Sequence, residues 1–286
     1  MVKYFRLCGR LSASMPLAHV VHLAKYPKRP VPRLRGLEKF ACIGGAWATN
    51  CYPGARCDSP APFYQFLDAS LSDGWKWSQR FPHRNEILAY FAYVDSKVNI
   101  SQEYDFEVSV TKAEFDENES IWNIDVSDGR TLSARWLVPA VGFASHISIP
   151  DIQGLGKFQG AVIHTGAWPS SGYNLKDKKV AVIGTGTSAN QVIREIEPRV
   201  SSMTVYQRSP AIVLPQSPTV PESTTSSFSL SEDEKMTFAA KSLSTFTGFD
   251  YQFLSPHAVP AGSPQRLRYY DHVYKKGGWK SVFFQF

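Results

Sequence analysis

Cysteine is scarce in this sequence, with four in 286 residues. None belongs to a C-x-x-C pair or has histidines at zinc spacing, so a vicinal redox pair is disfavoured and no metal site is expected. Reduced thiols and a cytoplasmic location are the simplest expectation. Long apolar runs are also missing: no stretch approaches the roughly 18 consecutive apolar residues of a membrane span, so no integral membrane segment is expected.

Acidic residues are absent from residues 1–37, which hold eight Lys or Arg. The whole chain has a formal net charge of +6, and without this basic arm the rest has a net charge of −2. A nucleic-acid-binding surface would spread basic residues over the folded body, so we expect no nucleic-acid partner. The arm lacks a clean amphipathic repeat and contains three prolines in its second half. An organellar targeting peptide is therefore disfavoured. The favoured interpretation of the arm is replacement sequence at an altered start or splice junction.

Apolar spacing in the rest of the chain predicts alternating helices and strands. The spacing predicts a helix at residues 87–98, strands at 106–115, 121–126 and 134–141, and a turn at 116–120. Residues 214–233 are rich in Ser, Thr and Pro and predict a long surface loop. Residues 234–274 then predict helical structure.

The strongest local pattern is Gly184-x-Gly186-x-x-Ala189 between a predicted strand at 179–183 and an amphipathic helix. A further strand at 203–207 completes a β-turn-α-β unit with parallel strands. The first glycine permits a tight turn, the second lets the backbone approach a pyrophosphate, and the alanine allows close packing. The helix N-terminus then faces the anion. The pattern predicts a nicotinamide dinucleotide site at Gly184, Thr185, Gly186, Ser188, Ala189 and Gln191, the alternative being a turn that merely requires glycines.

The end of the second strand indicates which dinucleotide binds. It reads Tyr206-Gln207-Arg208 and has no acid to hold the ribose hydroxyls of NAD. A guanidinium can bind a 2′-phosphate through paired hydrogen bonds, so Arg208 favours NADPH over NADH. The alternative is a solvated surface arginine.

Residues 158–169 resemble a family signature. They place Phe158, Gly160, His164, Trp168 and Pro169 in the pattern F-x-G-x-x-x-H-x-x-x-W-[PD] of Baeyer–Villiger monooxygenases, just ahead of the glycine motif. The tryptophan favours this branch over the related N-oxygenating flavin monooxygenases. The resemblance implies that this segment joins two dinucleotide domains and couples their motion to catalysis. It thereby implies catalytic roles for His164 and Trp168. In isolation, either residue would more simply be a packed core side chain.

A second block is similar to the flavin-side segment of the same family. It comprises residues 44–47 and 52–58, and its continuation at 63–66 is similar to fungal members. The resemblance implies that Glu38 holds the adenosine ribose of FAD, that Val110 meets the adenine through its backbone, and that Asp58 supports an active-site arginine. It further implies that the flavin is lined by Gly45, Trp47, Asp58 and Tyr64. The alternative is a glycine-rich loop with buried aromatics.

The resemblance implies an α/β flavoprotein with two Rossmann-like dinucleotide-binding domains, and the sequence also departs from it. No first glycine fingerprint precedes Glu38, and the family's active-site arginine would lie beyond Phe286. We therefore expect an incomplete FAD domain and a partial NADPH domain with a helical insertion. The expected division is a non-matching arm at 1–37, the rest of the FAD domain at 38–150, an NADPH-binding unit with linker at 151–213, and the loop and helical insertion at 214–286.

The implied activity is insertion of one oxygen of O2 into a ketone to give an ester or lactone, using FAD and NADPH, in fungal secondary metabolism. The main alternative is a truncated non-catalytic paralogue, or a misassembled gene product, that retains at most NADPH binding. An interaction protein whose basic arm meets an acidic partner is a neighbouring possibility. A flavin-free dehydrogenase is disfavoured because the sequence has no proton-relay motif. The sequence predicts neither the ketone nor the oligomeric state.

Overall fold

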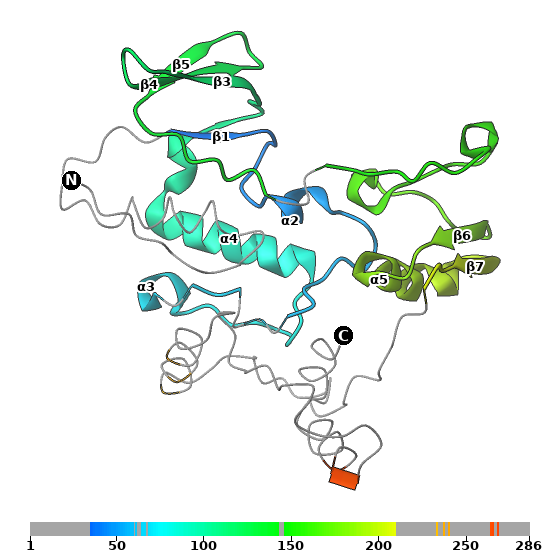
Figure 1. Cartoon of the computed structure of the whole chain (residues 1–286). Coiled ribbons are helices and arrows are strands. Elements are labelled where there is room, and N and C mark those ends of the chain that lie inside the picture. Colours follow the sequence, from blue (N-terminus) through cyan, green and yellow to red (C-terminus); the bar gives the residue numbers. More distant parts are fainter. Residues whose placement is uncertain are drawn as a thin grey trace. The chain divides into compact units, whose positions relative to one another are not determined.

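The computed structural model describes residues 35–59, 61, 64–66, 68–142 and 146–209, with six isolated positions between 233 and 268. The chain divides into two compact units, one of residues 11–75 and 80–206, the other of residues 1–10, 76–79 and 207–286. All elements named below belong to the first unit (Figure 1). The predicted loop at 214–233 and helical segment at 234–274 lie, isolated positions apart, outside the described residues. The domain boundaries stay predictions.

A long helix lies between two short parallel strands in the chain order. Helix α4 (Arg84–Val98) confirms the predicted helix and begins three residues earlier than expected. It ends at Asn99, which adopts the left-handed conformation that commonly stops helices. After the 3₁₀ turn η2 (Ile100–Glu103), strand β2 (Tyr104–Phe106) pairs in parallel with β1 (Gly36–Glu38). The last residues of the predicted arm are thus part of this pair.

Three antiparallel strands follow in the order β3 (Val110–Asp116), β4 (Ile121–Val126) and β5 (Thr131–Ala134). They confirm the strand at 121–126 and the turn before it. The single strand predicted at 106–115 is divided in two, because Glu107 has a φ of 59° that no regular strand accommodates. Val108, Ile124 and Val126 form a small core against which Leu37 of β1 packs.

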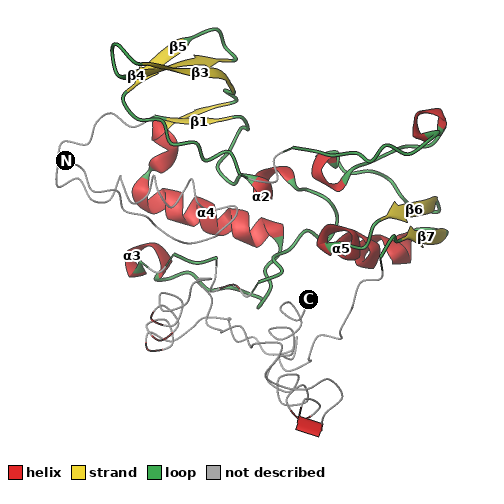
Figure 2. Ribbon diagram, viewed as in Figure 1, coloured by secondary structure: helices red, strands yellow, loops and turns green. Residues whose placement is uncertain are grey.

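The strand predicted at 134–141 is wrong. Strand β5 ends at Ala134, and Figure 2 draws the following residues as loop. The exposed fractions of Trp136, Val138 and Val141 are 65%, 66% and 77%. An apolar run becomes a strand only where a neighbour satisfies its backbone groups, and none of the described strands pairs with this segment.

The predicted β-turn-α-β unit is confirmed. Strand β6 (Lys179–Ile183) and strand β7 (Ser202–Tyr206) pair in parallel, from Lys179 opposite Ser202 to Ile183 opposite Tyr206. Between them, α5 (Thr187–Ile196) buries Val192 and Ile196, and the 3₁₀ turn η5 (Glu197–Arg199) follows at Pro198. Figure 1 shows the helix beside the two strands.

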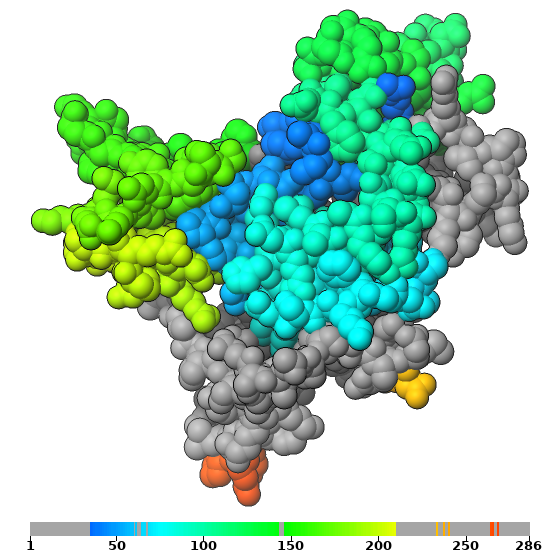
Figure 3. Space-filling model, turned by 180° about the vertical axis from the view of Figure 1, so that it is seen from behind, coloured from blue at the N-terminus to red at the C-terminus, as the bar shows by residue number. Residues whose placement is uncertain are grey.

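Short helical segments complete the first unit: α2 (Ala46–Thr49), α3 (Ala69–Ser72), η3 (Leu155–Lys157) and η4 (Thr165–Ala167). The guanidinium of Arg84 on α4 donates to the Ala48 carbonyl oxygen of α2 at 3.0 Å. Figure 3 shows the blue segment after β1 lying against the cyan atoms of α4. In the described part of the chain, no helix combines the length and apolar character needed to cross a membrane.

Candidate functional site

The glycine turn between β6 and α5 faces open space at both of its glycines. Gly184 has a φ of 106°, which favours glycine, and its N–H donates to the Tyr206 carbonyl oxygen at 2.8 Å. Gly186 is the N-cap residue of α5. A Cβ added at either glycine would meet no atom within 4 Å. The first amides of a helix lack partners inside it, so this turn presents donors to free space, as a pyrophosphate requires.

The other residues predicted at this turn lie in its immediate surroundings. The Thr185 carbonyl oxygen accepts a hydrogen bond from the Asn190 side chain at 3.1 Å. Burial raises the pKa of Tyr52, and the Ser188 side chain lies close enough to its hydroxyl to lower that pKa in part. Ala189 is half-buried. Arg208 is exposed and follows Tyr206 by two residues, but it belongs to the second compact unit. Its contact with a 2′-phosphate stays a prediction.

Gln191 on α5 makes its hydrogen bonds with a loop far away in the sequence. Its side-chain Nε2 donates to the Arg56 carbonyl oxygen at 3.0 Å, and its Oε1 accepts from the Arg56 N–H at 3.3 Å. The same oxygen accepts from the Tyr52 hydroxyl at 3.0 Å. The predicted dinucleotide contact of Gln191 stays a prediction, whereas its contact with this loop is present in the structure.

Two aromatic residues predicted at the flavin lie together. The rings of Trp47 and Tyr64 meet edge to face, with centroids 5.7 Å apart and planes at 77°. The Trp47 Nε1 atom is buried and has no hydrogen-bond partner. A buried unpaired donor is costly, and an acceptor supplied by a ligand would satisfy it. Gly45 immediately precedes α2 as its N-cap residue.

Glu38 and Val110, predicted at the adenosine end, lie on β1 and β3. Glu38 ends β1, and its Oε1 accepts from the Phe40 N–H at 3.1 Å. The Glu38 carbonyl oxygen accepts from the Val108 N–H at 3.0 Å, two residues before Val110. An acid at the carboxyl end of a parallel strand has the position that a ribose contact requires.

Buried neutral groups surround Asp58. Burial raises the pKa of the Cys57 thiol to about 12, and burial also raises the pKa of Tyr64 well above its usual range. The Asp58 carboxylate adds to both shifts, because a nearby negative charge disfavours a second one. Cys57 and Tyr64 therefore stay protonated at neutral pH. Asp58 itself is exposed, so its carboxylate is accessible to a ligand.

The signature residues His164 and Trp168 flank η4. His164 Nδ1 accepts from the Gly166 N–H at 3.1 Å and caps this turn. The Trp168 carbonyl oxygen accepts from the Cys51 thiol at 3.1 Å. The structure therefore brings the signature segment at 158–169 to the loop at 51–56, which we call the flavin-side loop. The catalytic roles implied for the two side chains stay predictions.

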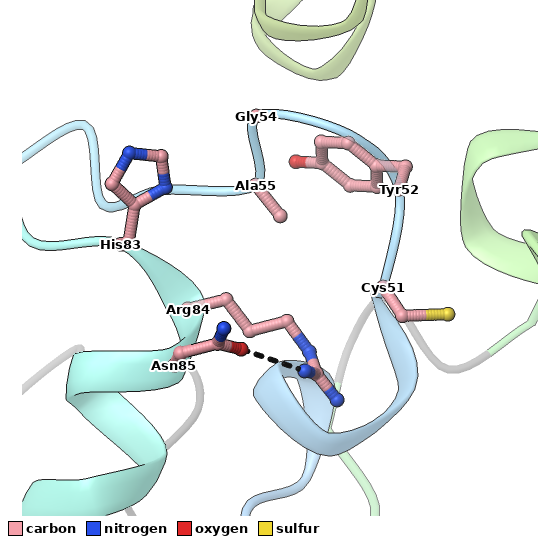
Figure 4. A pocket seen from close by; sticks show the side chains of 7 residues that line it. All are labelled: Cys51, Tyr52, Gly54, Ala55, His83, Arg84 and Asn85. Atoms are coloured by element: carbon pink, nitrogen blue, oxygen red, sulfur yellow. Dashed lines mark hydrogen bonds between the residues drawn. The ribbon is translucent and has the colours of Figure 1, made fainter. Parts of the chain in front are cut away.

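A shallow pocket of about 200 Å³ lies between this loop and the start of α4 (Figure 4). Its lining consists of Cys51, Tyr52, Gly54, Ala55, His83, Arg84 and Asn85. Ligand pockets usually measure about 300–1,000 Å³, so this space is too small for a dinucleotide. In the described part of the chain, no cluster of three or more His, Cys, Asp or Glu residues could hold a metal ion.

Sequence reasoning missed the residues that join the two parts of this site. Cys51 contacts Trp168. Tyr52 contacts Gln191 and lies near Ser188, and the main chain of Arg56 contacts Gln191. The sequence contains Tyr-Pro-Gly at 52–54 and predicts the helix α5, but nothing in it indicates that the two meet. Gln191 and Arg56 are 135 residues apart, and no local pattern links positions at that separation.

Comparisons with known proteins agree with the geometry. The family model of L-lysine 6-monooxygenase/L-ornithine 5-monooxygenase matches residues 63–254. The FAD-binding monooxygenase lolF2 of Epichloe uncinata is 38% identical over 247 residues, which cover 86% of this chain and 46% of lolF2. A Baeyer–Villiger monooxygenase of Pseudooceanicola batsensis is 30% identical over 246 residues, which cover 86% of this chain and 45% of that enzyme.

Among solved structures, cyclohexanone monooxygenase from Rhodococcus sp. Phi1 bound to NADP+ matches with a TM-score of 0.73 and 30% identity. The match covers 91% of this chain and 48% of that one. This chain spans about half the length of the curated relatives it matches. Its fold is the α/β fold of the flavoproteins with two dinucleotide-binding domains. The chain therefore belongs to the flavin-dependent monooxygenases, and its relatives and structural neighbours include enzymes of the Baeyer–Villiger type.

Proposed function

We propose that this chain acts as an FAD- and NADPH-dependent monooxygenase that inserts one oxygen of O2 into a ketone and gives an ester or lactone. The observation that carries this proposal is the open turn at Gly184 and Gly186, which begins a helix packed beside two parallel strands. This arrangement is suited to the pyrophosphate of a dinucleotide.

NADPH is the dinucleotide that the residues favour. The turn from Gly184 to Ala189 would hold the pyrophosphate through the amides of α5. Strand β7 ends at Tyr206 without an acid that would repel a 2′-phosphate. Arg208 supplies a guanidinium two residues later, and such a group binds phosphate by paired, charge-assisted hydrogen bonds.

The flavin-side residues fit FAD in part. The unpaired Trp47 Nε1 would donate to the cofactor, Glu38 would bind the ribose, and Asp58 would present its carboxylate to the site. The sequence before Glu38 provides no glycine fingerprint for the FAD pyrophosphate. When bound, the flavin supplies the redox chemistry with O2, and the protein supplies binding and orientation. His164 and Trp168 would hold the connecting segment against the flavin-side loop.

The relatives support the substrate class. One is named as FAD-binding and another as a Baeyer–Villiger enzyme, and the cyclohexanone monooxygenase structure contains NADP+. These names favour a small-molecule ketone as the substrate. The role in fungal secondary metabolism and the cytoplasmic location predicted from the sequence stay predictions.

Dinucleotide binding is the first test. Titration calorimetry with NADPH and NADH should show a clear preference for NADPH. Arg208→Ala should weaken NADPH binding about 10- to 100-fold, the effect of one charge-assisted pair, and leave NADH binding unchanged. Arg194→Ala, which removes an exposed charge from α5, is the matched control. Equal affinities for both nucleotides in the wild-type protein would contradict the assignment of Arg208.

Turnover is the second test. The purified protein, supplied with FAD, should show the absorbance of bound oxidised flavin. Cyclic ketones should then stimulate NADPH oxidation, and mass spectrometry should detect a product heavier than the ketone by one oxygen atom. NADPH binding without flavin absorbance or ketone-stimulated oxidation would contradict the monooxygenase proposal and favour the non-catalytic alternative.

A further inference from the structure

The Gln191 side chain holds the main chain of Arg56 at two points. Its Nε2 donates to the Arg56 carbonyl oxygen at 3.0 Å, and its Oε1 accepts from the Arg56 N–H at 3.3 Å. The amide therefore pairs with this residue as a neighbouring backbone would in a strand ladder. Two opposed hydrogen bonds fix the orientation of the loop as well as its distance from α5.

Tyr52 extends this contact to the first turn of the helix. Its hydroxyl donates to Gln191 Oε1 at 3.0 Å and lies near the Ser188 side chain. Ser188 and Gln191 are three positions apart and therefore share one face of α5. Ser188 lies two residues after Gly186, so the tyrosine is connected to the turn proposed to hold the dinucleotide.

Gly54 allows the loop to lie directly on the helix backbone. Its φ is 78°, and an added Cβ would lie 2.7 Å from the Gln191 carbonyl oxygen and 2.5 Å from Glu195 Cγ. Any side chain would force the two segments apart. Figure 4 shows Gly54 at the edge of the pocket nearest the yellow-green ribbon of α5.

The loop also continues into the flavin-side residues. Ala55 and Cys57 are buried, with exposed fractions of 4% and 1%, and Asp58 follows immediately. At its other end, the Cys51 thiol donates to the Trp168 carbonyl oxygen. Blue atoms of this region meet the yellow-green atoms of the β6–α5–β7 unit in Figure 3. Gln191 thus connects α5 to the loop that precedes Asp58.

We propose that Gln191 is a positioning residue that fastens the loop Cys51–Arg56 to the dinucleotide-binding helix and so couples nucleotide binding to the flavin side. The coupling rests on the proposed function, whereas the fastening itself does not. The Gln191 Oε1 atom accepts two hydrogen bonds from the loop and its Nε2 atom donates one to it, so Gln191 acts through the loop.

Hydrogen exchange of the full chain tests the fastening without nucleotide. Gln191→Leu removes all three hydrogen bonds at similar volume, and amide exchange in residues 51–56 should rise about tenfold or more. Tyr52→Phe removes one bond and should give a smaller rise. Arg194→Ala on the same helix should give none. Unchanged exchange of the loop in Gln191→Leu would overturn the proposal.

The coupling is tested by adding NADP+. In the wild-type protein the nucleotide should slow exchange of residues 51–56. At NADP+ concentrations that saturate the Gln191→Leu variant, the nucleotide should no longer slow exchange of this loop. Loss of NADP+ binding with an unaltered loop would instead make Gln191 a direct ligand contact and overturn the positioning role. If the wild-type protein does not bind NADP+, the proposed function fails, and the nucleotide-free comparison still tests the fastening.

Discussion

The Gly184 N–H donates to the Tyr206 carbonyl oxygen at 2.8 Å, so the glycine turn between β6 and α5 begins at the last residue pair of the β6–β7 ladder. This bond continues the parallel pairing by one position beyond Ile183. The turn is therefore held by the sheet on one side and by α5 on the other. Gly184 adopts a conformation that other residues avoid, whereas Gly186 has a φ of −71° that any residue adopts.

Alanine substitutions at the two glycines should differ in their effects on the free energy of unfolding and on NADP+ affinity. Gly186→Ala should leave the free energy of unfolding within about 0.5 kcal/mol, because its methyl group meets open space. The same methyl group would occupy the approach of the pyrophosphate, and NADP+ affinity should fall about tenfold or more. Gly184→Ala should instead lower the free energy of unfolding by about 1–3 kcal/mol. Urea unfolding and calorimetric titration measure both quantities. Normal NADP+ affinity in Gly186→Ala would contradict the site.

Tyr90 predicts a stability effect independent of any ligand. This side chain is fully buried on α4, and its hydroxyl oxygen accepts from the Phe66 N–H at 2.8 Å. Tyr90→Phe leaves that amide without its acceptor, which should cost about 1–3 kcal/mol in the free energy of unfolding. Tyr173→Phe alters an exposed side chain and serves as the control in the same urea titration. Equal stability of the two variants would show that the Phe66 amide finds another acceptor.

The lowered pKa of His83 predicts that the free energy of unfolding decreases in mild acid. Burial, and then the nearby Arg56 guanidinium, hold the pKa of His83 below its usual value of 6.5. The unfolded chain therefore binds a proton at a higher pH than the folded chain does. The free energy of unfolding should fall as the pH drops through about 6.5 and level off only below the folded pKa. Urea unfolding between about pH 8 and pH 5 should show a flatter profile for His83→Gln, and identical profiles would refute this origin.

The cysteines predict a large difference in thiol reactivity. Cys57 is 1% exposed and has a pKa raised to about 12 by burial, while Cys42 is exposed. At about pH 8 only about one Cys57 in ten thousand is a thiolate, which is the reactive form. Iodoacetamide labelling followed by peptide mass spectrometry should modify Cys42 at least about tenfold faster. The difference should disappear in concentrated urea. Rapid native labelling of Cys57 would contradict the buried position.

Helix α4 and the β6–α5–β7 unit were predictable because their signals are local. The apolar spacing of residues 87–98 repeats within one helix face, and the glycine turn lies directly between a strand and a helix pattern. The start of α4 at Arg84 was less evident, because the side chain of its N-cap residue His83 makes no capping hydrogen bond. The site residues predicted around the turn rest on this same local pattern and stay predictions.

The sequence alone determined the glycine turn between β6 and α5, since φ preferences and helix periodicity act between neighbouring residues. Only the tertiary structure decided that residues 135–141 form no ladder. A strand needs hydrogen bonds to a second strand, and the local sequence does not specify whether one is present. The tertiary structure likewise decided that Gln191 meets Tyr52 and Arg56. Hydrogen bonds between segments 135 residues apart form only once the chain has packed, and their geometry is set by that packing.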